Sequence, residues 1–205
     1  MQWGQADHFP KPQHYASRVC VHKHGWFLAV LFLVSFAVIV LAVYQGAVAE
    51  FSVSGPRWFA LALACMLLSM PLHEVLHLVA HPRCGANHES VMGWLRRFSV
   101  PVALWVGYAG WVSRKRTIYI LLLPFCVLGV AVPIAGYMIG GEIGSLLVAI
   151  GAANIIGSRY DLEASASLLC SDARVVHDSR DGYYVPHAEG SARNDSIQRA
   201  RCARR

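Results

Sequence analysis

A histidine–glutamate–histidine motif stands inside an apolar stretch of the sequence, MPLHEVLHLVAHP at residues 70–82. Within it, His73, Glu74 and His77 form the pattern H-E-x-x-H. On a helix, positions i and i+4 share a face and lie about 6 Å apart along the axis. Two imidazoles at this spacing can bind one zinc ion, and Glu74 is placed to take a proton from water activated by the metal. The alternative is a pair of interfacial histidines, with Glu74 paired to a loop cation such as Arg83.

A catalytic zinc site needs a third protein ligand, and we expect it to be Asp161. Asp161 follows a short apolar segment. An ionisable side chain costs free energy in such a place and therefore indicates a function. His81 continues the helical face of the motif, but on a straight helix it lies about 12 Å along the axis from His73. His88 and Glu89 are weaker candidates, because their loop would have to fold back.

Asp161 also has an alternative role as a helix cap. Ser158 and Asp161 match the capping pattern S-x-x-D. Asn154 lies seven residues before Asp161, which is two helical turns and nearly the same face. Its amide could donate to a substrate carbonyl or to a developing oxyanion, or it could join two helices.

The composition favours a membrane protein. Hydrophobic residues make up 56% of the 205 residues and charged residues 15%, whereas soluble domains have about 45–50% and about 25%. Four apolar segments span residues 26–49, 56–80, 117–139 and 143–157, and the last must extend toward Asp161 to cross a bilayer. We therefore expect an all-α membrane protein with about four transmembrane helices. The net charge is +6, but the basic residues are scattered between apolar segments and not gathered on one face. This argues against a nucleic-acid partner.

The connections between the apolar segments are alternately rich and poor in Lys and Arg. Since connections rich in these residues stay in the cytoplasm, this pattern predicts the topology. We expect an integral multi-pass protein with both termini in the cytoplasm. It would have a cytoplasmic N-terminal segment (1–25), a membrane-embedded metalloprotease domain (26–170) and a polar, basic cytoplasmic tail (171–205). In this topology the second and fourth spans end on the same side, so that His73, His77 and Asp161 can meet.

The segment 99–113, SVPVALWVGYAGWVS, is predicted to be a short β-hairpin or a re-entrant strand between the second and third helices. It is apolar but too short and too rich in Pro and Gly for a helical span, and its Val, Trp and Tyr residues favour strands. An unpaired strand edge beside the zinc could hold a substrate in extended form. Alternatively, the segment is an aromatic anchor at the membrane interface.

Three motifs together carry a resemblance to a known family. HEVLH, GYAGWVSRKRTIYILLLPF and AANIIGSRYDLEA look like the bacterial putative zincin peptidase family, which is similar to the site-2 type of intramembrane metalloprotease. The similarity covers roughly residues 58–184. It implies zinc bound by His73, His77 and Asp161, with Glu74 catalytic. Unlike the site-2 proteases, in which Gly commonly follows the Asp, this chain has Leu162 there.

The function expected from these observations is zinc-dependent hydrolysis of a peptide bond in or at a membrane. The partners would be the lipid bilayer and a membrane protein or peptide substrate, and the location a bacterial plasma membrane. The oligomeric state is open. A non-catalytic metal-binding membrane protein, such as a sensor or carrier, would use the same histidines but tolerate the loss of Glu74. A partner-binding membrane protein would need no metal.

Overall fold

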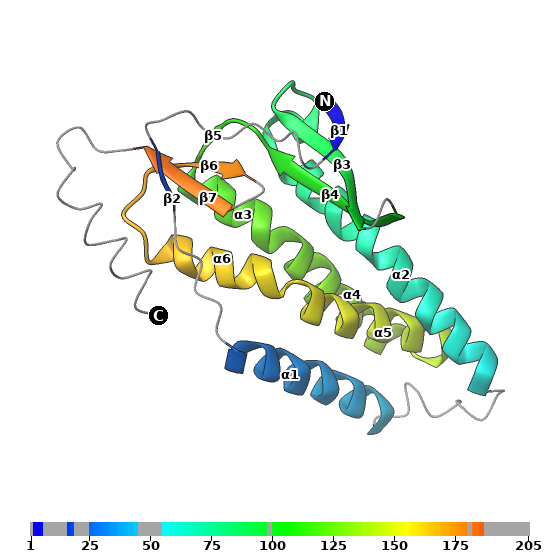
Figure 1. Ribbon diagram of the computed structural model, residues 1–205. Coiled ribbons are helices and arrows are strands. Elements are labelled where there is room, and N and C mark those ends of the chain that lie inside the picture. The colour runs from blue at the N-terminus through cyan, green and yellow to red at the C-terminus, as the bar shows by residue number, and fades with distance from the viewer. Residues whose placement is uncertain are drawn as a thin grey trace.

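The computed structural model describes residues 2–5, 16–18, 25–44, 55–97, 100–179 and 182–186. Helices make up most of this part of the chain, and they lie side by side below two small sheets (Figure 1). The helices are α1 (Gly25–Tyr44), α2 (Gly55–Ala80), α3 (Arg114–Pro124), α4 (Val132–Ile139), α5 (Gly141–Gly157) and α6 (Arg159–Leu169).

Helices α3 and α4 belong to one continuous helix, which contains a wide turn at Phe125–Ala131. Within this turn the Val132 N–H donates to the Val127 carbonyl, five residues back, instead of the four of an α-helix. Pro133 follows directly. Because proline has no backbone N–H, it cannot donate to a carbonyl of the preceding turn, and one regular helical hydrogen bond is missing. The wide turn thus lets the helix continue past this proline.

Helix α5 folds back on α4 and packs closely against it through two glycines. A Cβ on Gly136 would lie 2.7 Å from the Gly144 carbonyl oxygen, and one on Gly144 would lie 2.4 Å from that of Gly136. Only glycine permits two helical backbones to approach this closely. On the other side of α5, Ser35 of α1 donates to the Ala152 carbonyl. Helix α5 is therefore held between α4 and α1.

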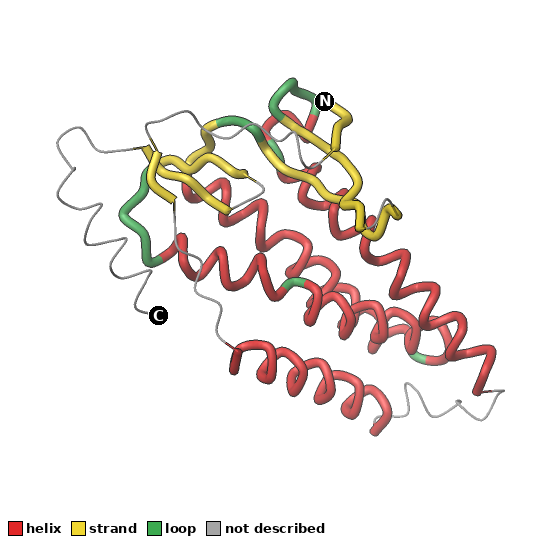
Figure 2. The backbone as a smooth tube through the Cα atoms, in the orientation of Figure 1, coloured by secondary structure: helices red, strands yellow, loops and turns green. Residues whose placement is uncertain are grey.

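The two sheets lie over one end of the helices (Figure 2). The first sheet has the order β1-β3-β4 and the second β2-β7-β6-β5, with β1 and β3 as a parallel pair and the other pairs antiparallel. The strands are β1 (Gln2–Gln5), β2 (Ala16–Arg18), β3 (Ser90–Arg97), β4 (Val100–Tyr108), β5 (Trp111–Ser113), β6 (Val175–Ser179) and β7 (Gly182–Pro186).

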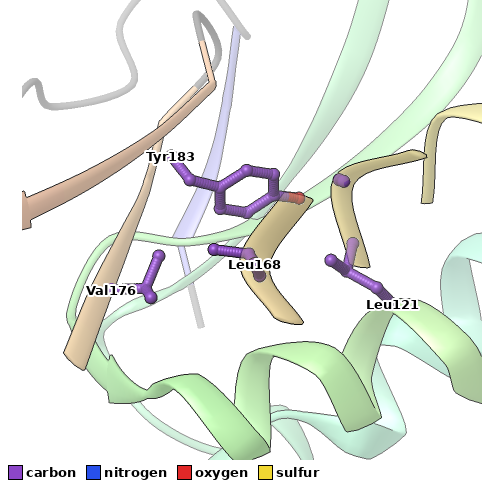
Figure 3. Close-up of a cluster of buried hydrophobic side chains, with 5 residues drawn as sticks. Leu121, Leu168, Val176 and Tyr183 are labelled. Atoms are coloured by element: carbon purple, nitrogen blue, oxygen red, sulfur yellow. The ribbon is translucent and has the colours of Figure 1, made fainter. Parts of the chain in front are cut away.

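A small apolar core joins the second sheet to the helices (Figure 3). It contains residues from α3, α6, β6 and β7, and its members are Leu121, Ala164, Leu168, Val176 and Tyr183. Each is at most 5% exposed. Since burial of an aliphatic side chain contributes about 1.5–3 kcal/mol, this cluster fixes the β6–β7 hairpin to the helices.

The prediction of an all-α protein with about four transmembrane helices is wrong. The structure combines helices with two sheets, and one helix of the described residues, Arg114–Ile139, is long and apolar enough to cross a membrane. The pair α5 and α6 passes the same test only as a single span bent by 50°. Among the described residues, the apolar parts of the first two helices, Trp26–Val38 and Leu67–Ala80, are too short to cross a bilayer. Hydropathy also does not separate apolar side chains that pack within the protein, such as the buried Ile120, Val148 and Ile155, from those that face lipid.

Strands β4 and β5 lie within residues 99–113, but they belong to different sheets and do not form the expected hairpin with each other. The hairpin partner of β4 is β3, which begins earlier, at Ser90. Part of the expected polar tail forms the β6–β7 hairpin. The tail beyond residue 186, most of the N-terminal segment 1–25 and the end of the first apolar segment lie outside the described residues.

Candidate metal centre

Two helical elements bring the expected ligands together. His73 and His77 lie on one face of α2, as the i, i+4 spacing predicts. Asp161 lies in the first turn of α6, directly after the 50° bend at Ser158 that separates α6 from α5. The bend turns the start of α6 toward α2. His77 and Asp161 are buried, and the His73 side chain is 12% exposed.

The distances between the three side chains fit one zinc ion. His73 Nε2 lies 3.0 Å from Asp161 Oδ2 and 3.1 Å from His77 Nε2, and His77 Nε2 lies 3.5 Å from the same carboxylate oxygen. Ligands bound to tetrahedral zinc at about 2.0–2.1 Å stand roughly 3.3 Å from one another. Two imidazoles and one carboxylate are also a known ligand set for catalytic zinc. The residues therefore fit the metal.

The hydrogen bonds at Nδ1 of His73 and of His77 fix the tautomer of each ring. His73 Nδ1 donates to Asn154 Oδ1 at 2.8 Å, and His77 Nδ1 donates to the Ile120 carbonyl at 2.9 Å. Neither oxygen can donate, so both protons must lie on Nδ1. In the neutral rings, both Nε2 lone pairs then face each other and the Asp161 carboxylate. Such a convergence of acceptors is suited to bind a cation.

Glu74 is held beside this group by a strand of the first sheet. Its carboxylate oxygen Oε2 accepts the backbone N–H of Val106, on β4, at 3.0 Å. Val106 N–H points away from β3 because the ladder of an antiparallel pair uses alternate residues. Tyr108, two residues further, directs its N–H the same way and donates to Asp178 Oδ2 at 3.2 Å. This edge of β4 therefore faces Glu74 and Asp178.

A cavity of about 270 Å³ lies at this point. Its walls come from α2, β4, α3, α6 and the β6–β7 hairpin, and they combine the three expected ligands and Glu74 with apolar side chains such as Val106, Ile120 and Leu121. Ligand sites of this kind are mostly apolar, with a few convergent polar groups. The cavity thus joins the metal ligands to a surface that an apolar substrate can contact.

Asn154 is buried and does not line this cavity. Besides accepting from His73, its amide donates to the Pro124 carbonyl and to Ser158 Oγ, both at 3.2 Å. The geometry supports a role in orienting His73 and joining helices, rather than a contact to substrate. Ser158 caps α6 without a side-chain hydrogen bond to the helix backbone, so the capping box considered for Asp161 does not form.

The other histidine and glutamate candidates do not belong to the group of three side chains, although His81 lines the same cavity. His81 is 1% exposed, and its Nδ1 lies 3.1 Å from Ser90 Oγ. Burial, followed by the neighbouring His77 and Arg116, lowers the pKa of His81 to about 4. His88 is exposed, and Glu89 accepts a short hydrogen bond from the Tyr108 hydroxyl. Burial and this hydrogen bond raise the pKa of Tyr108 to about 12.

Val106, Asp178 and Tyr183 are among the cavity residues that were not found from the sequence. The last two belong to the β6–β7 hairpin, where they are cross-strand partners. The run VVHDSRDGYYV carried a signal for that hairpin, because β-branched and aromatic residues flank a D-G pair.

Comparison with known proteins agrees with this geometry. No curated protein and no solved structure matches the chain. A family described as "putative zincin peptidase" matches residues 66–176, which is more than half of the 205 residues and includes the H-E-x-x-H motif and Asp161. The chain belongs to this family.

Proposed function

We propose that the protein is a zinc-dependent metallopeptidase that hydrolyses peptide bonds at a membrane. The observation that carries the proposal is the convergence of His73 Nε2, His77 Nε2 and Asp161 Oδ2 within 4.8 Å of one another, beside the Glu74 carboxylate. A zinc ion held there would lower the pKa of water and polarise the carbonyl that is attacked. The family match supports the same class of activity.

Glu74 acts as the general base in this proposal. It lies one residue after His73 on α2, and before substrate binds the Val106 N–H orients its carboxylate. The carboxylate takes a proton from the attacking water and then returns it to the nitrogen of the leaving amine, so that it ends the cycle unchanged. A proton shuttle of this kind requires a carboxylate, because a glutamine side chain cannot accept the proton.

The edge of β4 is the proposed binding surface for the substrate backbone. β3 pairs with one edge of β4, and at the other edge the N–H groups of Val106 and Tyr108 donate to Glu74 and Asp178. An extended peptide added along this edge would exchange these two carboxylate contacts for backbone hydrogen bonds. Such a peptide would place its scissile carbonyl beside Glu74, because Glu74 already contacts the strand.

Exposed apolar side chains support the membrane location. Several large hydrophobic residues on the helices are more than half exposed: Leu33, Phe36, Leu67, Leu68, Ile134, Met138, Ile139 and Ile143. Exposed apolar surface, where it is extensive, marks membrane or protein contacts. The basic residues Arg114, Lys115 and Arg116 stand at the opposite end of the Arg114–Ile139 helix, where phosphate headgroups would neutralise them.

Proteolysis by the detergent-purified protein tests this function. A library of quenched-fluorescent peptides with apolar side chains would be incubated with wild type, Glu74→Gln and the control Glu142→Gln, whose carboxylate is exposed on α5. We expect cleavage by wild type and the control, and a loss of at least about 1,000-fold in Glu74→Gln with its zinc retained. Full activity in Glu74→Gln would exclude the proposed mechanism.

A further inference from the structure

The Tyr183 hydroxyl is a polar group of the metal cavity that the mechanism above does not use. Tyr183 lies on β7, is 5% exposed and lines the same cavity as His73, Glu74 and Asp161. Among the residues that the structure describes, no hydrogen-bond partner is found for its hydroxyl. A phenol inside a protein usually has such a partner, and this one lines a cavity that can hold a ligand.

The protein backbone fixes the direction of this side chain. Tyr183 and Asp178 are cross-strand partners, so both project from the same face of the β6–β7 hairpin, and both line the cavity. Asp178 also accepts the Tyr108 N–H and thereby ties the hairpin to the edge of β4. The hairpin thus spans from the substrate edge to the start of α6, where Asp161 lies.

Apolar packing holds the Tyr183 ring in place. The ring contacts the cluster of Leu121, Leu168 and Val176, and its oxygen points away from β7 toward the helices (Figure 3). A donor held by a packed ring needs no reorganisation when charge develops in front of it. This is the arrangement that stabilises an oxyanion.

The phenol keeps its proton in this environment. Burial, and then the nearby Asp178, Tyr160, Asp161 and Glu74, raise the pKa of Tyr183 well above its ordinary value. The hydroxyl is therefore a neutral donor throughout the pH range in which a peptidase works. It can give a hydrogen bond without losing the proton.

We propose that Tyr183 is a catalytic residue whose hydroxyl donates a hydrogen bond to the carbonyl oxygen of the scissile bond as that oxygen becomes negatively charged. No proton is transferred: the oxygen gains charge when water adds to the carbonyl carbon, and loses it when the C–N bond breaks. The inference rests on the proposed function. It adds a catalytic residue beyond the segment that the family comparison covers, because that match ends at residue 176.

Tyr183→Phe tests the proposal, since it removes the hydroxyl and keeps the ring in the core. Tyr184→Phe is the matched control: Tyr184 neighbours it on β7 but pairs with His177 and does not line the cavity. The first readout is calorimetric binding of a phosphinic peptide with leucine and phenylalanine side chains, in which a tetrahedral anion replaces the scissile carbonyl. The second is the cleavage of the peptide library.

With zinc content and thermal midpoint unchanged, Tyr183→Phe is expected to bind the phosphinic peptide at least about tenfold more weakly and to lose about 100-fold in kcat, with KM unchanged. Tyr184→Phe is expected to match wild type in both readouts. Equal phosphinate affinity in Tyr183→Phe and wild type would overturn the assignment and leave the metallopeptidase intact. Zinc-loaded wild type that neither binds the analogue nor cleaves peptides would contradict the proposed function, and the assignment would fall with it.

Discussion

The imidazole of His73 and the side-chain amide of Asn154 form a hydrogen bond of 2.8 Å between α2 and α5, across 81 positions of sequence. Because the Asn154 amide nitrogen donates to Pro124 and Ser158, its oxygen remains to accept from His73. The bond fixes the tautomer in which His73 Nε2 has a lone pair for a metal. A residue outside the cavity thereby sets the metal-binding state of a residue inside it.

Asn154→Leu should weaken zinc binding. Leucine has a similar volume but leaves His73 Nδ1 without its acceptor, and loss of such a partner lowers metal affinity by roughly 10–100-fold. Competition with a zinc chelator measures the affinity. The control is the neighbouring substitution Ala153→Ser, which lies on α5 outside the contact with His73. Unchanged zinc affinity in Asn154→Leu would show that the hydrogen bond does not orient the ligand.

The close approach of α4 and α5 predicts that a methyl group added at Gly136 lowers the stability of the protein. Gly136→Ala should destabilise the protein by about 1–3 kcal/mol, because the new Cβ would lie 2.7 Å from the Gly144 carbonyl oxygen. Gly157→Ala is the control, since a Cβ added there would meet no atom within 4 Å, and alanine is favoured over glycine in helices. Thermal unfolding in detergent compares the two. Equal or greater stability of Gly136→Ala would contradict the helix packing.

The low pKa of His81 predicts a pH dependence of stability. Its pKa is about 4 in the folded protein and about 6.5 in an unfolded chain. The unfolded state therefore binds more protons between these values, so the contribution of His81 is complete above pH 6.5 and is lost as the pH falls toward 4. Over this range wild type should lose roughly 1–3 kcal/mol more than His81→Asn. Denaturant titrations at several pH values measure the difference, with the exposed His88→Asn as control. Parallel curves for wild type and His81→Asn would contradict the burial of a neutral imidazole.

The exposed apolar surface predicts how the protein partitions to lipid. The double variant Met138→Lys and Ile143→Lys places two charges on side chains that are 77% and 64% exposed, and should reduce recovery with phosphatidylcholine vesicles by more than about tenfold. Flotation after detergent removal measures this recovery. Glu142→Lys alters charge at the same end of the helices without removing apolar surface, and should float like wild type. Equal flotation of the double variant would argue that this surface does not contact lipid.

The sequence predicted the convergence of His73, His77 and Asp161 better than it predicted the fold. The spacing of His73 and His77 puts both on one helical face, and an aspartate after an apolar segment is costly unless it binds a partner. Both expectations follow from short stretches of sequence. The number of spans cannot be predicted in this way, because it depends on which helices pack together, as α4 and α5 do at Gly136 and Gly144. The roles of Asp178 and Tyr183 depend on the β6–β7 hairpin folding back over α3 and α6, a contact between distant segments that local patterns do not specify.

The zinc content of the purified protein tests the central claim most directly. Elemental mass spectrometry would compare wild type with His77→Ala, Asp161→Ala and the control His88→Ala, whose imidazole is exposed in the loop after α2. The account predicts about one zinc per chain in wild type and His88→Ala, and loss of the metal in both ligand variants. Full zinc content in Asp161→Ala, or none in gently purified wild type, would contradict it.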